Sequence, residues 1–244
     1  MKLCAAQLAS LKGDLQGNLQ RHLQVVRQAA ALGAGLVVFP ELSLSGYEPS
    51  LARGLAVDST SSLLAPLQAL SDALGIVISV GLPLLAAQGV QIGMPILRPG
   101  LPPLLYAKQR LHSDELRWFV AADEPVVFEA GEHHLAPAIC YESMFLSHAE
   151  QAHALGADVY LVSVAKTAQG IEEGYAHYPE TARRFDMPVI MANCVGPADT
   201  FVGAGQSAAW DRQGRLLGAL SAGEEGLLML DTRQHRATSF PLAG

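Results

Sequence analysis

Short, largely apolar runs alternate with amphipathic segments along most of this chain. Leu3–Leu8 and Leu36–Phe39 have the pattern of short strands buried in a sheet. The segment between them begins at Asn18, an expected N-cap, and has apolar residues three or four positions apart, as on one face of a helix. The chain therefore opens with a predicted strand, helix and strand.

The same helix-then-strand unit is predicted four times. The helices are expected over residues 18–32, 61–74, 143–155 and 179–185, and the strands that follow them over residues 36–39, 76–80, 159–164 and 189–192. Three of the junctions contain Ala-Leu-Gly, in which the glycine ends the helix. Two units precede residue 81 and two follow residue 142, so we expect two similar halves.

Shorter strands fill the rest of the chain. They are expected over residues 94–97, 104–108, 125–130, 135–139 and 226–230, with a hairpin over residues 206–220 whose turn is Asp211–Gly214. Mixed strands with helices in two pairs predict an α/β fold, a four-layer α-β-β-α sandwich with two mixed sheets face to face and helices outside. The length fits a single domain, residues 1–244, whose short tail, residues 231–244, is available to pack on a partner subunit.

Composition excludes several classes of function. Only 16% of the residues are charged, the formal net charge is −7, and no basic cluster is longer than Arg183-Arg184, which argues against a nucleic-acid partner. No apolar stretch is long enough to span a membrane, and the start of the chain lacks the apolar region of a signal peptide. The three widely spaced cysteines favour a reducing, cytoplasmic setting over a disulfide framework.

Three chemically useful side chains stand where predicted strands end. Glu41 follows the run Leu36–Phe39 and Pro40, Lys108 closes the run that begins at Leu104, and Cys140 follows the run that ends at Ile139. Taken singly, they are typical of an ion-paired glutamate, an edge lysine and a buried cysteine. If the three strand ends meet, however, Glu41 can take the thiol proton, and Lys108 can stabilise both the thiolate and the oxyanion that forms at a carbonyl or nitrile carbon.

The segments around these residues resemble the signatures of the nitrilase superfamily, the carbon–nitrogen hydrolases. The resemblance covers nearly the whole chain, and the segments that carry it are Phe39–Tyr47, Tyr106–Leu111, Ile139–Glu142, Gly156–Asp158, Ala192–Gly196 and Gly205–Ser207. It implies the α-β-β-α sandwich and homodimers, or higher homo-oligomers, that extend it. It also implies a Glu–Lys–Cys triad of Glu41, Lys108 and Cys140, with the backbone N–H of Tyr141 beside Lys108 in the oxyanion hole.

The resemblance implies further roles near these positions. A second glutamate is expected shortly after the lysine, and Glu115 matches it best, with Asp114 as the alternative. Glu142 is interpreted as a helix-start residue with a structural ion pair. The substrate-wall candidates are Tyr47, Ala165 and Lys166. Lys166 is either a contact for an acidic substrate or an exposed loop lysine. The specificity loops are expected over residues 43–54 and 167–177.

The function that follows is a cofactor-free amide hydrolase that acts through a thioester and releases ammonia or an amine from a small molecule. Hydrolysis of an N-carbamoyl group, hydrolysis of a nitrile, acyl transfer and a non-enzymatic binding role stay open. Tyr141 is followed by Glu-Ser, which departs from the Tyr-Asp-Ile-Arg typical of ω-amidases and argues against the monoamide of a dicarboxylic acid. No pair of histidines has metal-ligand spacing, so neither a metal nor a cofactor is expected.

Overall fold

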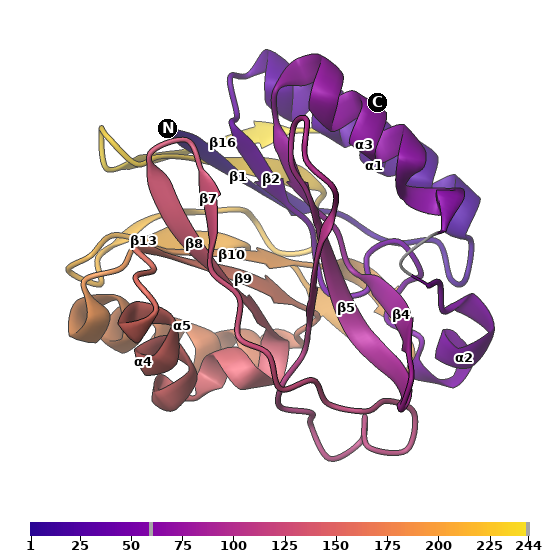
Figure 1. Cartoon of the computed structure of the whole chain (residues 1–244). Coiled ribbons are helices and arrows are strands. Elements are labelled where there is room, and N and C mark those ends of the chain that lie inside the picture. Colours follow the sequence, from indigo (N-terminus) through magenta and orange to yellow (C-terminus); the bar gives the residue numbers. More distant parts are fainter. Residues whose placement is uncertain (59–60, 243–244) are drawn as a thin grey trace.

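Two sheets face each other between two layers of helices (Figure 1). This computed structural model describes residues 1–58 and 61–242. The predicted four-layer α-β-β-α sandwich is therefore confirmed. Within the described ranges, no helix combines the length and apolarity needed to cross a bilayer.

The first sheet has eight strands in the described part of the chain. In spatial order they are β16 (Arg236–Pro241), β15 (Gly226–Asp231), β1 (Lys2–Gln7), β2 (Leu36–Val38), β3 (Val77–Ser79), β5 (Gly89–Leu97) and β4 (Leu82–Ala86), and β6 (Leu104–Ala107) also pairs with β5. Strands β1, β2 and β3 run parallel, with Leu3 opposite Leu36 and Leu36 opposite Val77. The outer pairs are antiparallel.

The second sheet repeats this parallel centre. Its order is β14 (Leu216–Ala219), β13 (Ala208–Trp210), β10 (Val189–Asn193), β9 (Val159–Val164), β8 (His133–Ile139) and β7 (Phe128–Ala130). Strands β8, β9 and β10 are parallel, with Ile139 opposite Ser163. A separate two-stranded sheet joins β11 (Val195–Ala198) and β12 (Phe201–Ala204). The two parallel centres agree with the expectation of two similar halves.

The helices cover the outer face of each sheet. Helices α1 (Leu15–Ala31) and α3 (Ala65–Leu74) lie over the first sheet, and α4 (Leu146–Ala154) and α5 (Ala168–Phe185) lie over the second (Figure 1). Shorter helical segments are η1 (Pro49–Leu51), α2 (Ala52–Leu55), η2 (Ser62–Leu64) and η3 (Cys140–Met144). The last of these follows β8 directly.

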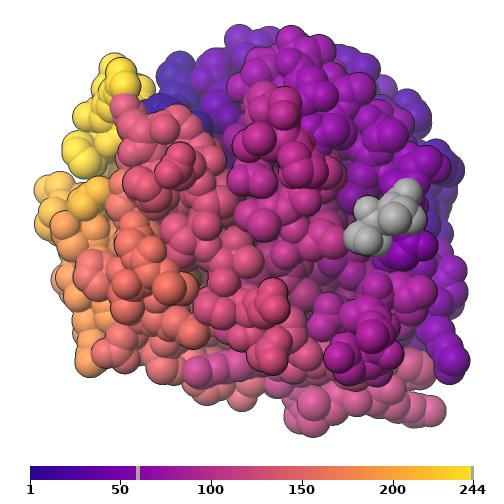
Figure 2. Space-filling view, viewed as in Figure 1, coloured from indigo at the N-terminus to yellow at the C-terminus, as the bar shows by residue number. Residues whose placement is uncertain are grey.

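The hydrophobic core has three layers. Side chains from both sheets form the central layer, which includes Leu36, Leu135 and Leu161. One outer layer lies between the first sheet and its helices, and the other lies between the second sheet and α4 and α5. In the space-filling view, atoms close the gap that the ribbon drawing leaves between the sheets (Figure 2). Apolar burial on both faces explains why the central strands read as continuous apolar runs.

The largest difference from the sequence prediction is α5. A helix was expected only from Pro179, because proline favours a first turn, and residues 167–177 were expected to be a loop. The helix instead begins at Ala168, capped by the Thr167 side chain, and continues through Pro179. Buried residues at helical spacing, including Ile171, Tyr178 and Phe185, continue across the proline, and their packing offsets the missing N–H.

Smaller differences concern caps and hairpins. Asp14, not Asn18, caps α1, while Asn18 lies inside the helix and its side chain binds backbone groups of Leu11 and Leu44. The hairpins β4–β5 and β11–β12 were not fully predicted. The tail forms β16, which pairs with β15 of its own chain, and its last two residues, 243–244, lie outside the described part.

Candidate active site

The ends of β2, β6 and β8 meet and bring three predicted residues together. The Nζ atom of Lys108 lies 2.7 Å from Oε1 of Glu41, and both side chains are fully buried. Cys140, the residue after β8, lies near enough to Glu41 for each group to affect the pKa of the other. Across the two sheets, the Ser163 hydroxyl donates a hydrogen bond of 2.8 Å to the carbonyl of Phe39, which fixes the end of β2 against β9.

Glu115, not Asp114, reaches the lysine. Its Oε1 lies 2.6 Å from Lys108 Nζ and also accepts a hydrogen bond of 2.9 Å from the Tyr47 hydroxyl. Its Oε2 accepts from the backbone N–H of His112 at 2.7 Å. Asp114 is exposed and contacts the His112 ring instead. Lys108 is thus held between two carboxylates, and three donors fix Glu115.

Cys140 occupies a sharp turn between β8 and η3. Its φ of +48° lies in the left-handed region, which non-glycine residues rarely adopt. The next residue, Tyr141, stands in the first turn of η3, where backbone N–H groups have no partner within a helix. A thiol in such a turn is presented beside free backbone donors, the arrangement required for attack on a carbonyl and for holding the resulting oxyanion.

Glu142 holds this turn in place. Its Oε1 accepts hydrogen bonds of 2.6 Å from the Ile139 N–H and from the Tyr106 hydroxyl, and its Oε2 accepts one of 2.6 Å from the N–H of Gln109. These bonds join the end of β8 to the segment that follows Lys108. The expected structural position is therefore found, and hydrogen-bond donors hold it. Among the described residues, the expected ion-pair partner is represented only by the His148 ring, whose Nε2 lies 3.9 Å from Glu142 Oε1 and whose pKa burial lowers to about 4.

Burial and charge set the protonation states of the cluster. Burial raises the pKa of Glu41 to about 7, although the Lys108 ammonium opposes the shift. Burial and the Glu41 carboxylate raise the pKa of the Cys140 thiol to about 11. Burial alone would lower the pKa of Lys108, but Glu41, Cys140 and Glu115 together raise it. The cluster at rest is a protonated thiol, a permanent cation and a carboxylate able to exchange a proton near neutral pH.

A cavity of about 330 Å³ opens onto this cluster. All three predicted wall residues, Tyr47, Ala165 and Lys166, line it, together with Lys108, His112, Asp114, Glu115, Cys140, Tyr141, Met144, Thr167, Gly170, Glu173 and Phe201. The volume is at the small end of the range for ligand pockets, so the space suits a small molecule.

Sequence reasoning missed part of this wall. Phe201 comes from β12 and packs edge-on against Tyr47, with ring centroids 5.5 Å apart. Met144 follows the cysteine by four residues, and Gly170 lies in the first turn of α5. No local pattern marks Phe201 as a wall residue, because its position depends on the β11–β12 hairpin folding back over the site.

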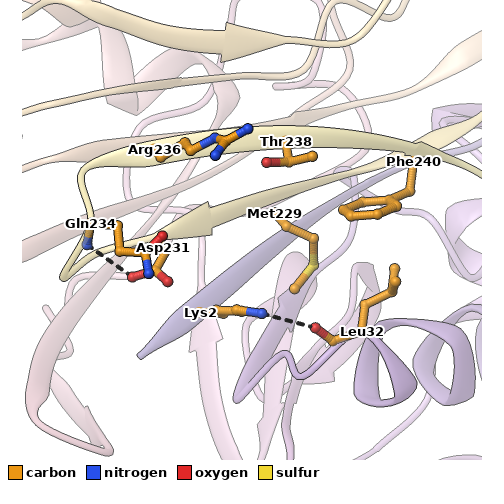
Figure 3. A pocket seen from close by; sticks show the side chains of 8 residues that line it. All are labelled: Lys2, Leu32, Met229, Asp231, Gln234, Arg236, Thr238 and Phe240. Atoms are coloured by element: carbon orange, nitrogen blue, oxygen red, sulfur yellow. Dashed lines mark hydrogen bonds between the residues drawn. The ribbon is translucent and has the colours of Figure 1, made fainter.

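Two other cavities have no cysteine in their lining that could act as a nucleophile. One of about 210 Å³ lies between β15, β16 and the end of α1 and is lined by side chains such as Lys2, Met229 and Arg236 (Figure 3). Another, of about 600 Å³, is lined mainly by apolar residues, with Ser50, Arg53 and Arg117. Neither is lined by a cysteine. Among residues 1–58 and 61–242, no group of three or more histidine, cysteine or acidic side chains is arranged to hold a metal.

Comparisons with known proteins point to one family. The sequence model described as carbon-nitrogen hydrolase matches residues 2–241. The structure resembles an amidase from Nesterenkonia sp. AN1 with a TM-score of 0.87 and 26% identity, covering 97% of this chain and 96% of that one. Another structure of that amidase, at 26% identity and covering 95% and 92% of the two chains, has a TM-score of 0.87 and shows acrylamide added at the active-site cysteine. A third, with a TM-score of 0.86, 26% identity and coverage of 97% and 94%, is a complex with butyramide.

Curated relatives at similar identity are longer proteins. Glutamine-dependent NAD(+) synthetase from Aquifex aeolicus is 25% identical over 93% of this chain, and the same enzyme from Xanthomonas campestris is 28% identical over 95%. The matched regions are only 41% and 44% of those relatives. The chain thus spans less than half the length of the synthetases that it matches.

Proposed function

The chain belongs to the carbon–nitrogen hydrolase family, and from that premise we propose that it is a cysteine-dependent amidase that cleaves a small-molecule amide through a thioester. The observation that carries the proposal is the buried contact of Lys108 with both Glu41 and Glu115, at 2.7 and 2.6 Å, on the floor of a cavity that exposes Cys140. An acid–base group, a cation and a nucleophile are thereby brought together where a small amide fits.

In the first half of the proposed cycle, the Cys140 thiol gives its proton to Glu41 as the sulfur bonds to the amide carbon. The electron pair of the carbonyl moves onto its oxygen, which the Lys108 ammonium and the Tyr141 N–H stabilise. When this intermediate collapses, the carbon–nitrogen bond breaks, and Glu41 returns the proton to the departing nitrogen. Ammonia or an amine leaves, and the acyl group stays on sulfur as a thioester.

In the second half, water attacks the thioester carbon and gives a proton to Glu41. The same two donors hold the second oxyanion. Its collapse breaks the carbon–sulfur bond, and the proton from Glu41 restores the thiol as the carboxylic acid leaves. Glu115 and Tyr47 keep Lys108 in place throughout, because Glu115 contacts the ammonium and Tyr47 donates to Glu115.

The proposal is tested with purified protein and a panel of small amides, glutamine, N-carbamoyl acids and nitriles, with ammonia release as the readout. We expect wild-type protein to release ammonia and Cys140→Ala to lose activity by at least about 10³-fold. Intact-mass measurement of quenched wild-type protein should show an acyl adduct on Cys140.

Cys4→Ala is the matched control. Cys4 is fully buried in β1, in the outer core layer below α1, so its removal tests whether loss of a buried thiol alone affects turnover. It should keep wild-type kcat. An acyl adduct on another residue, or equal activity in Cys140→Ala and wild type, would contradict the proposed mechanism.

Two further expectations remain part of the proposal. The first is a reducing, cytoplasmic setting. The unpaired state of all three cysteines, Cys4, Cys140 and Cys194, supports it. A homodimer that extends the sandwich is the expected assembly. Sedimentation analysis of the purified chain measures it directly.

A further inference from the structure

Lys166 is a second lysine of the cavity, and its ammonium has no partner among the described residues. Its side chain lines the same space as Cys140 and is only 8% exposed. Within the described residues, no carboxylate lies within ion-pair distance of its ammonium, and no acceptor receives a hydrogen bond from it. Its backbone is fixed: the N–H donates to Oδ1 of Asn193 at 2.8 Å, and the carbonyl accepts from Nδ2 of Asn193 at 3.2 Å.

The acidic side chains that line the cavity are already engaged. Glu115 contacts Lys108 and the Tyr47 hydroxyl, Asp114 contacts the His112 ring at 2.6 Å, and Glu173 accepts from the amide of Gln169 at 3.2 Å. None of them neutralises Lys166. The Lys166 stem is buried and its ammonium enters a partly enclosed cavity without a counter-charge from the described residues, so the cavity favours a ligand with a negative group.

The surroundings of Lys166 favour a negative group. Lys166 directly precedes the Thr167 cap of α5, and the N-terminus of an 18-residue helix carries partial positive charge. Gly170, in the first turn of that helix, leaves room for the lysine stem: a Cβ added there would lie 3.3 Å from Lys166 Cβ and 3.4 Å from its Cγ. The lysine can therefore lie against the helix start, with its ammonium in the cavity.

The strand register places this charge near the nucleophile. Ile139 is opposite Ser163 in the parallel pair β8–β9, so Cys140 and Lys166 leave neighbouring strands at the same edge, about 5 Å apart between strands. The charge of Lys166 acts on the Cys140 thiol, whose pKa it lowers against the effect of burial. A ligand that contacts both the Cys140 thiol and the Lys166 ammonium must therefore be short.

We propose that the cavity takes short amides that carry a carboxylate, with the carboxylate bound by Lys166 at the start of α5 and the amide carbonyl at Cys140. The inference rests on the proposed amidase function and specifies its substrate class. Neutral amides of the same length fit the cavity but leave the Lys166 ammonium unpaired. They are therefore the poorer substrates.

The test compares succinamate with butyramide, which have the same number of carbons and differ in a carboxylate and a methyl group. Wild-type protein should have a kcat/KM for succinamate that is on the order of 10- to 100-fold higher, the range expected for a hydrogen bond to a charged group. Lys166→Met should remove this advantage, mainly by raising KM. The KM for butyramide, which has no carboxylate to bind, should change less than the KM for succinamate.

Lys2→Met is the matched control, because it makes the same change of side chain and charge in an exposed residue of the cavity in Figure 3. It should leave the ratio between the two substrates unchanged. If Lys166→Met instead lowers kcat equally for both substrates and leaves both KM values unchanged, the ammonium serves only the thiol and the inference is overturned. A wild-type protein that hydrolyses both amides equally well also overturns it, while the proposed function stands.

A binding measurement separates this inference from the proposed function. Calorimetric titration of succinamate into Cys140→Ala requires no turnover, and the double variant with Lys166→Met should bind at least about tenfold more weakly. Such a difference supports the anion site even if wild-type protein hydrolyses no amide in the panel. Equal binding by the two variants, or no binding by either, overturns the inference.

Discussion

Two buried glutamates beside Cys140 have opposite environments. Glu142 has both oxygens occupied by donors, from Tyr106, Ile139 and Gln109. Glu41 receives Lys108 on Oε1, whereas its Oε2 accepts no hydrogen bond of ordinary length from the described residues. A carboxylate whose oxygens are filled is held in place, and one with a free buried oxygen facing a thiol can exchange a proton.

The same difference appears in what sets each pKa. Burial raises the pKa of both carboxyls, but hydrogen bonds from Tyr106, Ile139 and Gln109 oppose the shift at Glu142. At Glu41 the main opposing influence is the Lys108 charge, and the pKa rises to about 7. We therefore infer that the fold uses Glu142 to shape the turn and leaves Glu41 available for chemistry.

The largest expected effect is that of Glu41→Gln on turnover. Because the Cys140 thiol has a pKa raised to about 11, it needs a base, and loss of that base should lower kcat/KM by about 10³-fold. The fold should survive, since glutamine removes a carboxylate that is costly to bury. Ammonia release and thermal unfolding measure the two effects. Retained turnover at pH 7 would exclude Glu41 as the base.

The pH dependence of the same pair of proteins is a second readout. Glu41 must be ionised to act as a base, so wild-type kcat/KM should rise as pH increases through about 7. The contribution of Glu41 to the free energy of unfolding should change in the opposite direction and fall as pH increases. The folded carboxyl keeps its proton up to about pH 7, while the unfolded one, with the ordinary pKa of 4.5, loses it earlier. Its contribution to the free energy of unfolding therefore falls between these pH values, and Glu41→Gln should remove that decline.

Glu142→Gln should reverse the pattern. The carboxamide NH₂ would face a backbone N–H or the Tyr106 hydroxyl and leave a buried donor unpaired, so the free energy of unfolding should fall by about 3 kcal/mol. Turnover by the folded fraction should fall less than about tenfold, because Glu142 contacts no reacting atom in the proposed cycle. Urea titration gives the stability.

Glu150→Gln is the control for that variant, since it makes the same change at an exposed position of α4 and should shift stability by no more than about 0.5 kcal/mol. If Glu142→Gln unfolds like wild type but loses turnover as Glu41→Gln does, the two glutamates have the same role and the comparison fails.

The surroundings of Glu41 could be predicted from the sequence better than those of Glu142. Apolar runs before Glu41, Lys108 and Cys140 mark the ends of strands, and the resemblance to the nitrilase superfamily implied that these three residues meet. The partners of Glu142 could not, because the donors from Tyr106 and Gln109 are more than 30 residues away in sequence. Local patterns do not encode such contacts.

The environment of Lys166 also depends on contacts that local sequence patterns do not encode. Its place after a strand made it a wall candidate, but its lack of a partner depends on where Asp114, Glu115 and Glu173 find theirs. The Glu-Ser that follows Tyr141 argued against the monoamide of a dicarboxylic acid as substrate. In the structure, however, Lys166, just after β9, brings a positive charge into the cavity. The length of α5 was missed because its packing outweighs the proline.

The smallest expected effects separate two tyrosines that make the same kind of bond. The Tyr106 hydroxyl donates to Glu142 at 2.6 Å, and the Tyr47 hydroxyl donates to Glu115 at 2.9 Å. Tyr106→Phe should lower the free energy of unfolding by about 1.5 kcal/mol, the value of a buried hydrogen bond to a charged group, and change kcat less than threefold. Tyr47→Phe should do the reverse: stability within about 0.5 kcal/mol, because Tyr47 is partly exposed, and kcat lower by about tenfold, because Glu115 positions Lys108 less firmly. Each variant is the other's control, and if both lower only stability, Glu115 belongs with Glu142 as a structural carboxylate.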